Sequence, residues 1–130
     1  MMQGAANAPM SKDAQNRLLV CATCERVEGH TARQDCAVLR GALKQAGLSD
    51  AIEVDAVSCL GGCVAPVNIS LQGQGRATYV FDGLDVKDAQ SDIVTLSQMF
   101  LALDKGWIED ARPLGDLRNH LRARVPSFEP

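Results

Sequence analysis

The stretch that decides the fold reads Arg17-Leu18-Leu19-Val20-Cys21, and polar residues follow it at once. The stretch is short, apolar and partly β-branched, which predicts a buried strand with a cysteine at its end. The other cysteines of the chain are Cys24, Cys36, Cys59 and Cys63. What these thiols do depends on where the segments around this strand place them.

The segments that follow predict a parallel βαβ unit. Apolar residues recur at helical spacing over residues 35–46, and Gly47 supplies a left-handed stop. Asp35 is the expected N-cap, which would put Cys36 in the first helical turn, where free backbone amides and the helix dipole favour a thiolate. Residues 52–57 alternate between apolar and acidic side chains at first, and predict a second strand that ends just before the next cysteine pair.

A hairpin and a second helix complete the predicted layer. Residues 67–71 and 76–81 read as strands, and the turn between them is rich in residues that tolerate positive φ. An apolar stripe over residues 88–103 predicts an amphipathic helix with Asp85 as its cap. The order gives an α/β fold with a mixed four-stranded sheet and two main helices, which is compatible with a thioredoxin-like fold.

The chain of 130 residues fits one folded domain between two terminal segments. Residues 1–16 offer no apolar periodicity and are expected to form a flexible N-terminal tail. Residues 17–106 are expected to form the domain that carries the cysteines. Residues 107–130 read as a C-terminal extension with one short docked helix, whose apolar residues are Leu114, Leu117 and Leu121.

Composition excludes several classes of function. The net charge of -3 argues against nucleic-acid binding, which usually needs a basic stripe. No stretch approaches the roughly 20 apolar residues that span a bilayer, so no membrane insertion is expected. The chain starts without the apolar core of a secretory signal, which favours a cytoplasmic location. Five cysteines in such a chain argue against a disulfide framework and for metal or redox chemistry.

The cysteines form two groups, and each group follows a predicted strand. The first group is Cys21 and Cys24, with Cys36 nearby, and the second is Cys59 and Cys63. If the two parallel strands end together, both groups share one edge of the sheet and four thiolates can converge on one site. Gly61 and Gly62 would let backbone amides approach sulfur, and such hydrogen bonds tune the potential of an iron–sulfur cluster.

The cysteine segments resemble the thioredoxin-like 2Fe–2S ferredoxins. The segments that carry this resemblance are Leu19-Val20-Cys21-Ala22-Thr23-Cys24, Asp35-Cys36-Ala37-Val38-Leu39-Arg40-Gly41 and Cys59-Leu60-Gly61-Gly62-Cys63. Later segments resemble a poorly characterised bacterial branch described as metal-binding proteins with that ferredoxin fold, and they are residues 77–82, 106–108, 112–113 and 124–126. Together these segments extend over residues 18 to 126.

The resemblance implies a thioredoxin-like (ferredoxin) fold and a 2Fe–2S cluster that carries single electrons, so no enzymatic activity is expected. The ligands that it implies are Cys21, Cys36, Cys59 and Cys63. Cys24 is a fifth thiol beside Cys21, and in the metal-binding branch those two positions are expected to ligate together. All five cysteines are therefore candidate metal ligands. The expected partner is a redox protein, and a homodimer is left open.

Two alternatives use the same thiols. A zinc site accepts four thiolates, although Cys59 and Cys63 are separated by three residues rather than the two of a zinc knuckle. A thiol–disulfide oxidoreductase would use Cys21 and Cys24 as a redox dithiol. In such enzymes the motif opens a helix, whereas residues 25–34 carry no clear helical pattern, and three cysteines would be left without a role.

Overall fold

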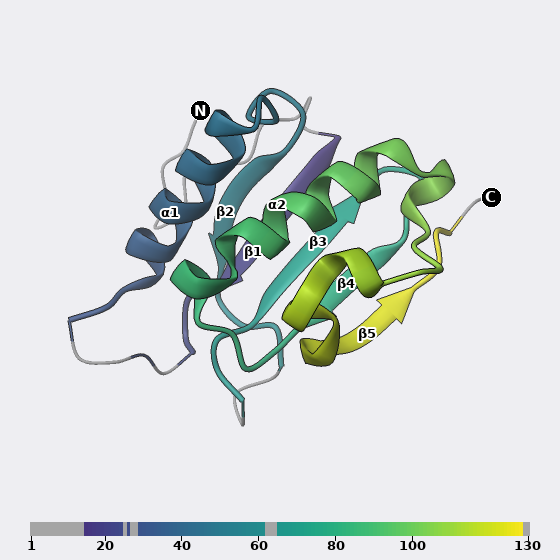
Figure 1. Ribbon diagram of the computed structural model, residues 1–130. Coiled ribbons are helices and arrows are strands. Elements are labelled where there is room, and N and C mark those ends of the chain that lie inside the picture. Colours follow the sequence, from purple (N-terminus) through teal and green to yellow (C-terminus); the bar gives the residue numbers. More distant parts are fainter. Residues whose placement is uncertain (1–14, 25, 27–28, 62–64, 129–130) are drawn as a thin grey trace.

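The computed structural model describes residues 15–24, 26, 29–61 and 65–128. Of the tail predicted over residues 1–16, residues 1–14 lie outside these ranges, and Asn16 already belongs to the first strand. The described part is a single α/β domain in which α-helices cover one face of a mixed sheet (Figure 1). The elements in chain order are β1 (Asn16–Cys21), α1 (Ala32–Gln45), β2 (Glu53–Val57), β3 (Ile69–Gly73), β4 (Thr78–Phe81), α2 (Val86–Ala102), the 3₁₀ helices η1 (Asp104–Gly106) and η2 (Arg112–His120), and β5 (Leu121–Val125).

The sheet has the strand order β2-β1-β3-β4-β5. β1 and β2 are parallel, and the pairs β1–β3, β3–β4 and β4–β5 are antiparallel. The predicted parallel unit and the predicted hairpin are thereby confirmed. Cys21 is paired with Val57 at the last position of the β1–β2 ladder. The loops that follow these two strands therefore leave the sheet at the same edge.

The two α-helices begin at different kinds of cap. Asp85 caps α2 as predicted, since its carboxylate accepts a hydrogen bond of 3.1 Å from the Asp88 amide. The prediction that Asp35 caps α1 is wrong. Thr31 is the cap, because its hydroxyl accepts from the Gln34 amide at 3.1 Å while the Gln34 side chain accepts from the Thr31 amide at 2.9 Å.

The sheet of the described chain has five strands, so the prediction of four is wrong. Leu114 and Leu117 are buried in η2 as expected of a docked helix, but Leu121 starts β5 instead of extending that helix. β5 pairs along β4, and Arg124 holds it in place by donating to the Ile108 carbonyl at 2.8 Å and covering the Trp107 ring at 4.0 Å. The C-terminal segment thus completes the sheet.

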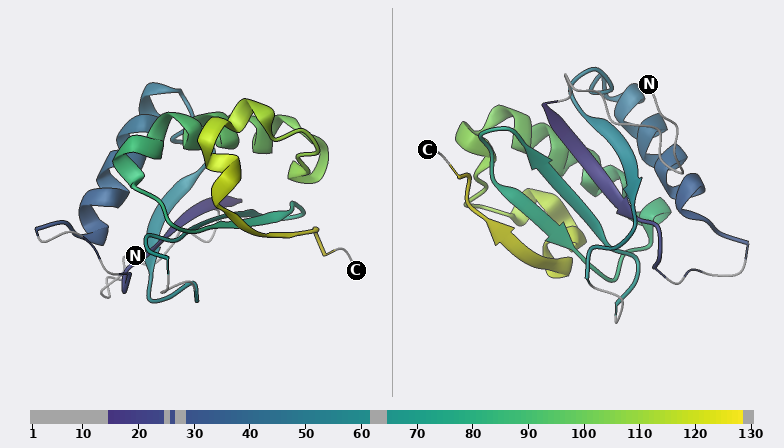
Figure 2. Two further views of the ribbon diagram at one scale, coloured as in Figure 1. Left: turned by 60° about the horizontal axis from the view of Figure 1, so that its bottom comes forward. Right: turned by 180° about the vertical axis from the view of Figure 1, so that it is seen from behind.

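The core lies between the sheet and the helices. Figure 2 shows α1, α2 and η2 on the same side of the sheet. The largest fully buried apolar side chains are Phe81, Phe100, Leu18, Leu39, Leu43, Ile69, Leu71, Ile93, Leu96, Leu117 and Val20. The buried Tyr79 hydroxyl donates to the Gly106 carbonyl at 2.6 Å and accepts from the Ile108 amide at 2.8 Å, which ties β4 to the segment after α2. None of the helices in the described ranges is long and apolar enough to cross a membrane.

Candidate metal centre

The site begins with the thiols of Cys21 and Cys24, which lie side by side where β1 ends. Both residues are buried, and the Cys24 thiol is a hydrogen-bond partner of the Cys21 sulfur. The turn between them follows directly from the strand, since the Cys21 amide still donates to the Asn68 carbonyl at 3.0 Å and the Ala22 amide to the Val57 carbonyl at 2.7 Å. The sheet ladder therefore fixes where this pair of thiols sits.

The loop after β2 packs directly against this pair. The Thr23 hydroxyl donates to the Ser58 carbonyl at 2.5 Å and lies 3.6 Å from the Cys21 sulfur. The Leu60 backbone amide is a hydrogen-bond partner of the same sulfur. Cys59, between these two loop residues, is exposed, and its sulfur accepts from the Gly61 amide at 3.2 Å. Gly61 has a φ of +85°, which a side chain would disfavour.

The thiol of Cys24 accepts a hydrogen bond from a buried side-chain amide. Asn68 is fully buried at the start of β3, and its Nδ2 donates to the Cys24 sulfur at 3.0 Å. A donor aimed at sulfur stabilises the thiolate form and, in a metal site, reduces the electron density on the ligand.

The pKa values of the two thiols are pushed apart. Burial by itself raises the pKa of Cys21, but hydrogen bonds from Thr23, Cys24 and the Leu60 amide outweigh it and lower the pKa to about 7. Burial raises the pKa of Cys24, and the neighbouring Cys21 raises it further, against the opposing effect of the Asn68 hydrogen bond. Near neutral pH the pair therefore holds one thiolate more readily than two separate thiols would.

Cys36 does not join this group in the structure. It lies one turn inside α1 and, like Cys21 and Cys24, belongs to the hydrophobic core, but within the described residues no hydrogen bond joins its thiol to theirs. Burial raises the pKa of its thiol. The predicted thiolate at a helix N-terminus is therefore wrong, because α1 begins at Ala32 and the free amides of its first turn precede Cys36.

Cys63 lies outside the described residues, two positions after Gly61. Within the described ranges, no group of three or more His, Cys, Asp or Glu side chains is arranged to hold a metal ion. The structure thus brings together Cys21, Cys24 and the loop that carries Cys59, and it places Cys36 apart from them.

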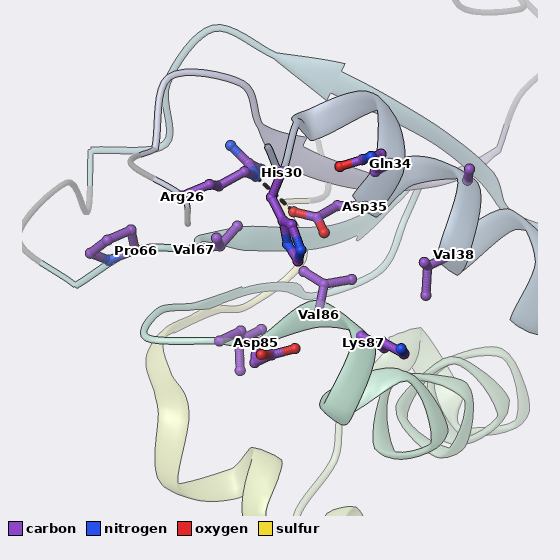
Figure 3. Close-up of a pocket in the computed structure, with 12 residues that line it drawn as sticks. Arg26, His30, Gln34, Asp35, Val38, Pro66, Val67, Asp85, Val86 and Lys87 are labelled. Atoms are coloured by element: carbon purple, nitrogen blue, oxygen red, sulfur yellow. Dashed lines mark hydrogen bonds and ion pairs between the residues drawn. The ribbon is translucent and has the colours of Figure 1, made fainter. Parts of the chain in front are cut away.

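A pocket of about 500 Å³ lies beside the thiol pair, between the N-terminal ends of α1 and α2. Its walls carry both charged residues and apolar side chains such as Val38 and Val86, and Figure 3 shows the ion pair of Arg26 and Asp35 among them. The Arg26 side chain also donates to the carbonyls of Cys21 and Cys24. Arg26 is therefore a residue of the pocket wall that contacts the turn bearing the thiols.

The donor set fits a metal that prefers sulfur. Thiolates select zinc, copper(I) and iron–sulfur clusters over hard cations. The site supplies two adjacent thiols, a third on the loop that packs against them, and donors to each of the three sulfurs from Leu60, Asn68 and Gly61. Such hydrogen bonds are typical of thiolates that carry charge.

Three residues of this site were missed by sequence reasoning. Thr23 and Asn68 have partners far along the chain, 35 positions away for Thr23 and Ser58 and 44 for Asn68 and Cys24. Arg26 contacts residues that are two to nine positions away. Asn68 left one signal, because a polar amide stands between Val67 and Ile69 at the start of a buried strand. Nothing in the sequence marks Arg26.

The titration of the thiol pair gives a direct prediction. In metal-free protein the first proton of the pair should leave near pH 7, and Cys21→Ser should remove that step from the ultraviolet thiolate absorbance. Because the folded pKa of Cys21 lies below that of a free thiol, the folded state binds fewer protons, and stability should rise with pH between about 7 and the ordinary value. A titration curve that Cys21→Ser leaves unchanged would contradict this assignment.

Comparison with known proteins gives a family match over most of the chain. Residues 18–127 match the family model described as "Protein of unknown function (DUF1636)". The comparison found this family and not the thioredoxin-like 2Fe–2S ferredoxins, so the resemblance to that ferredoxin family is corrected. No curated protein matches the chain.

Proposed function

The chain belongs to the DUF1636 family, and we propose that it holds a 2Fe–2S cluster on cysteine thiolates and carries single electrons for a partner protein. The observation that carries the proposal is the contact between the Cys21–Cys24 turn and the loop that bears Cys59. In this proposal the chain has no catalytic residues and is not an enzyme. The cluster would supply a reversible one-electron couple.

The proposed ligands are Cys21, Cys24, Cys59 and Cys63. Cys24 takes the place that the sequence resemblance gave to Cys36, since Cys24 shares a hydrogen bond with Cys21 and, among the described residues, Cys36 makes none with either thiol. Three amides near the ligands donate hydrogen bonds to their sulfurs. The amides of Asn68, Gly61 and Leu60 offset the negative charge of the sulfurs, which favours the reduced state.

The setting of the site supports the same proposal. Cys59 is exposed, so a partner protein could approach the site closely enough to exchange an electron. A cytoplasmic location would keep the thiols reduced until the cofactor is assembled. At the level of element order, the βαβ unit followed by a hairpin and a helix also supports a thioredoxin-like fold to which β5 is added.

Anaerobic purification tests this function. The protein should be coloured, with about two iron and two sulfide per chain as the 2Fe–2S composition requires. Dithionite should bleach the visible absorption and produce an EPR signal, and air should restore the oxidised spectrum. Colourless protein that contains stoichiometric zinc would overturn the electron-transfer proposal and establish the zinc alternative.

A second candidate function is thiol–disulfide exchange, and the split pKa values of Cys21 and Cys24 favour it. A thiol with its pKa lowered to about 7 beside one with a raised pKa is typical of redox dithiols. Against it, the Cys21 side chain is fully buried, which hinders attack on a substrate disulfide. Metal-free protein that forms a reversible Cys21–Cys24 disulfide and reduces insulin would support this candidate, and failure of both would exclude it.

A further inference from the structure

One buried arginine holds both ends of the turn that carries the thiol pair. The Arg26 side chain is only 6% exposed. Its Nη2 donates to the Cys21 carbonyl at 2.8 Å and its Nη1 to the Cys24 carbonyl at 3.0 Å. Its Nε donates to Asp35 Oδ2 at 2.7 Å, in the first turn of α1. A single guanidinium thus joins the two cysteines to the helix.

The geometry of this contact requires arginine. A guanidinium offers five donors in a rigid plane, so it can satisfy three acceptors that lie in fixed directions. A lysine ammonium at the same place would keep the positive charge but would not offer hydrogen-bond donors in the same fixed directions. Burying a charge is costly unless it is paired and hydrogen-bonded, and Arg26 meets this condition through Asp35 and the two carbonyls.

We propose that Arg26 is the positioning residue of the thiol site, which sets the separation of Cys21 and Cys24 before a metal or cluster binds. The part of this inference that concerns metal affinity rests on the proposed function. The part that concerns the turn does not, because the three contacts of Arg26 involve only protein atoms.

The ion pair of Arg26 and Asp35 also lines the pocket between the N-terminal ends of α1 and α2. Figure 3 shows Arg26 and Asp35 pointing toward each other across the pocket wall, one from the loop before α1 and the other from the helix itself. Asp35 therefore anchors the guanidinium to a regular element. Asp35 in α1 thus fixes the position of Arg26, and Arg26 in turn fixes the Cys21–Cys24 turn.

Cobalt(II) binding to the metal-free full chain tests the proposal. Arg26→Gln removes the charge and the rigid donor plane, and it should weaken cobalt affinity by about 10–100-fold, as the loss of an outer-shell partner does. Arg26→Lys should recover only part of that loss. Arg40→Gln is the control for the loss of an arginine that donates to a backbone carbonyl away from the thiols, because the exposed Arg40 donates to the Val54 carbonyl at 2.8 Å. The control should keep wild-type affinity.

Two further readouts separate positioning from general stability. At saturating cobalt the thiolate charge-transfer bands of Arg26→Gln should differ from wild type, which a mere loss of stability would not cause. In metal-free protein, amide hydrogen exchange over residues 21–26 should be faster in Arg26→Gln and unchanged in Arg40→Gln. If the wild-type chain binds no cobalt, the proposed function fails while the exchange experiment still tests Arg26. Wild-type exchange rates and spectra in Arg26→Gln would overturn the inference. If Arg26→Gln does not fold, Arg26→Lys decides by the same measurements.

Discussion

Cys24→Ser should abolish the bound iron, whereas Cys36→Ala should leave iron and sulfide content at the wild-type level. Cys24 shares a hydrogen bond with Cys21 and receives another from Asn68, so its sulfur lies where a second ligand is needed. Burial raises the pKa of both the Cys24 and the Cys36 thiol, but the Cys36 thiol has no hydrogen bond to Cys21 or Asn68 in the described residues. Iron and sulfide assays, with EPR after dithionite, measure the outcome.

The Cys36→Ala variant is also the control for the loss of a buried thiol. It removes one sulfur from the core and should cost stability of about 1 kcal/mol in urea unfolding, typical of a single core substitution, without loss of colour. The reverse pattern, with iron lost in Cys36→Ala and kept in Cys24→Ser, would show that Cys36 is the native ligand. Replacing both cysteines leaves three thiols and should prevent assembly under either assignment.

The elements that the sequence predicts well are those with local signals. β1 follows from a short apolar run and β2 from the alternation of apolar and acidic residues. The hairpin follows from the Gly73 and Gly75 turn, and the start of α2 from Asp85. Each of these signals lies within a few residues of the element that it predicts. The position of the thiol-bearing loops at one edge follows from the parallel pairing of the first two strands.

The start of α1 and the fifth strand could not be predicted in the same way. Asp35 is an acceptable cap on its own, and only the reciprocal bonds of Thr31 and Gln34 decide against it. Leu121 continues the leucine spacing of the predicted docked helix, which conceals the alternation of apolar residues and arginines from Leu121 to Val125. Its strand form depends on β4, which is about 40 residues away, and on the contact of Arg124 with Trp107.

In the candidate site too, some features have a local signal in the sequence and others depend on tertiary contacts. Cysteine spacing identifies the thiols, because sulfur ligands are rare and their grouping is visible in the sequence. The choice between Cys24 and Cys36 depends on which of them faces Cys21, and this is fixed by α1 and by Asn68 at the start of β3. Tertiary contacts of this kind leave no periodic pattern. They are the reason why the role of Asn68 emerges only from the structure. The partners of Arg26 are near in the chain, but two of them are backbone carbonyls, which no residue type identifies.

The stability of the fold and the integrity of the thiol site should be separable at Phe100. This fully buried side chain of α2 packs edge-on against Tyr79 with ring centroids 6.2 Å apart, and a Cβ at Gly106 would come within 2.9 Å of its ring. Phe100→Ala should lower the free energy of unfolding by about 3–5 kcal/mol, because it removes a large core side chain and leaves a cavity.

The thiols lie further along β1 than this contact, since Tyr79 is paired through Leu71 with Leu18 while Cys21 is the last residue of the strand. Under conditions in which Phe100→Ala remains folded, its iron content and its EPR signal should therefore match those of wild type. Phe128→Ala is the control, because Phe128 is 90% exposed and its removal should change the unfolding free energy little. Urea unfolding followed by circular dichroism gives the free energies. A loss of iron in folded Phe100→Ala would show that the core around Phe100, and not only the local turn, holds the cysteines in place.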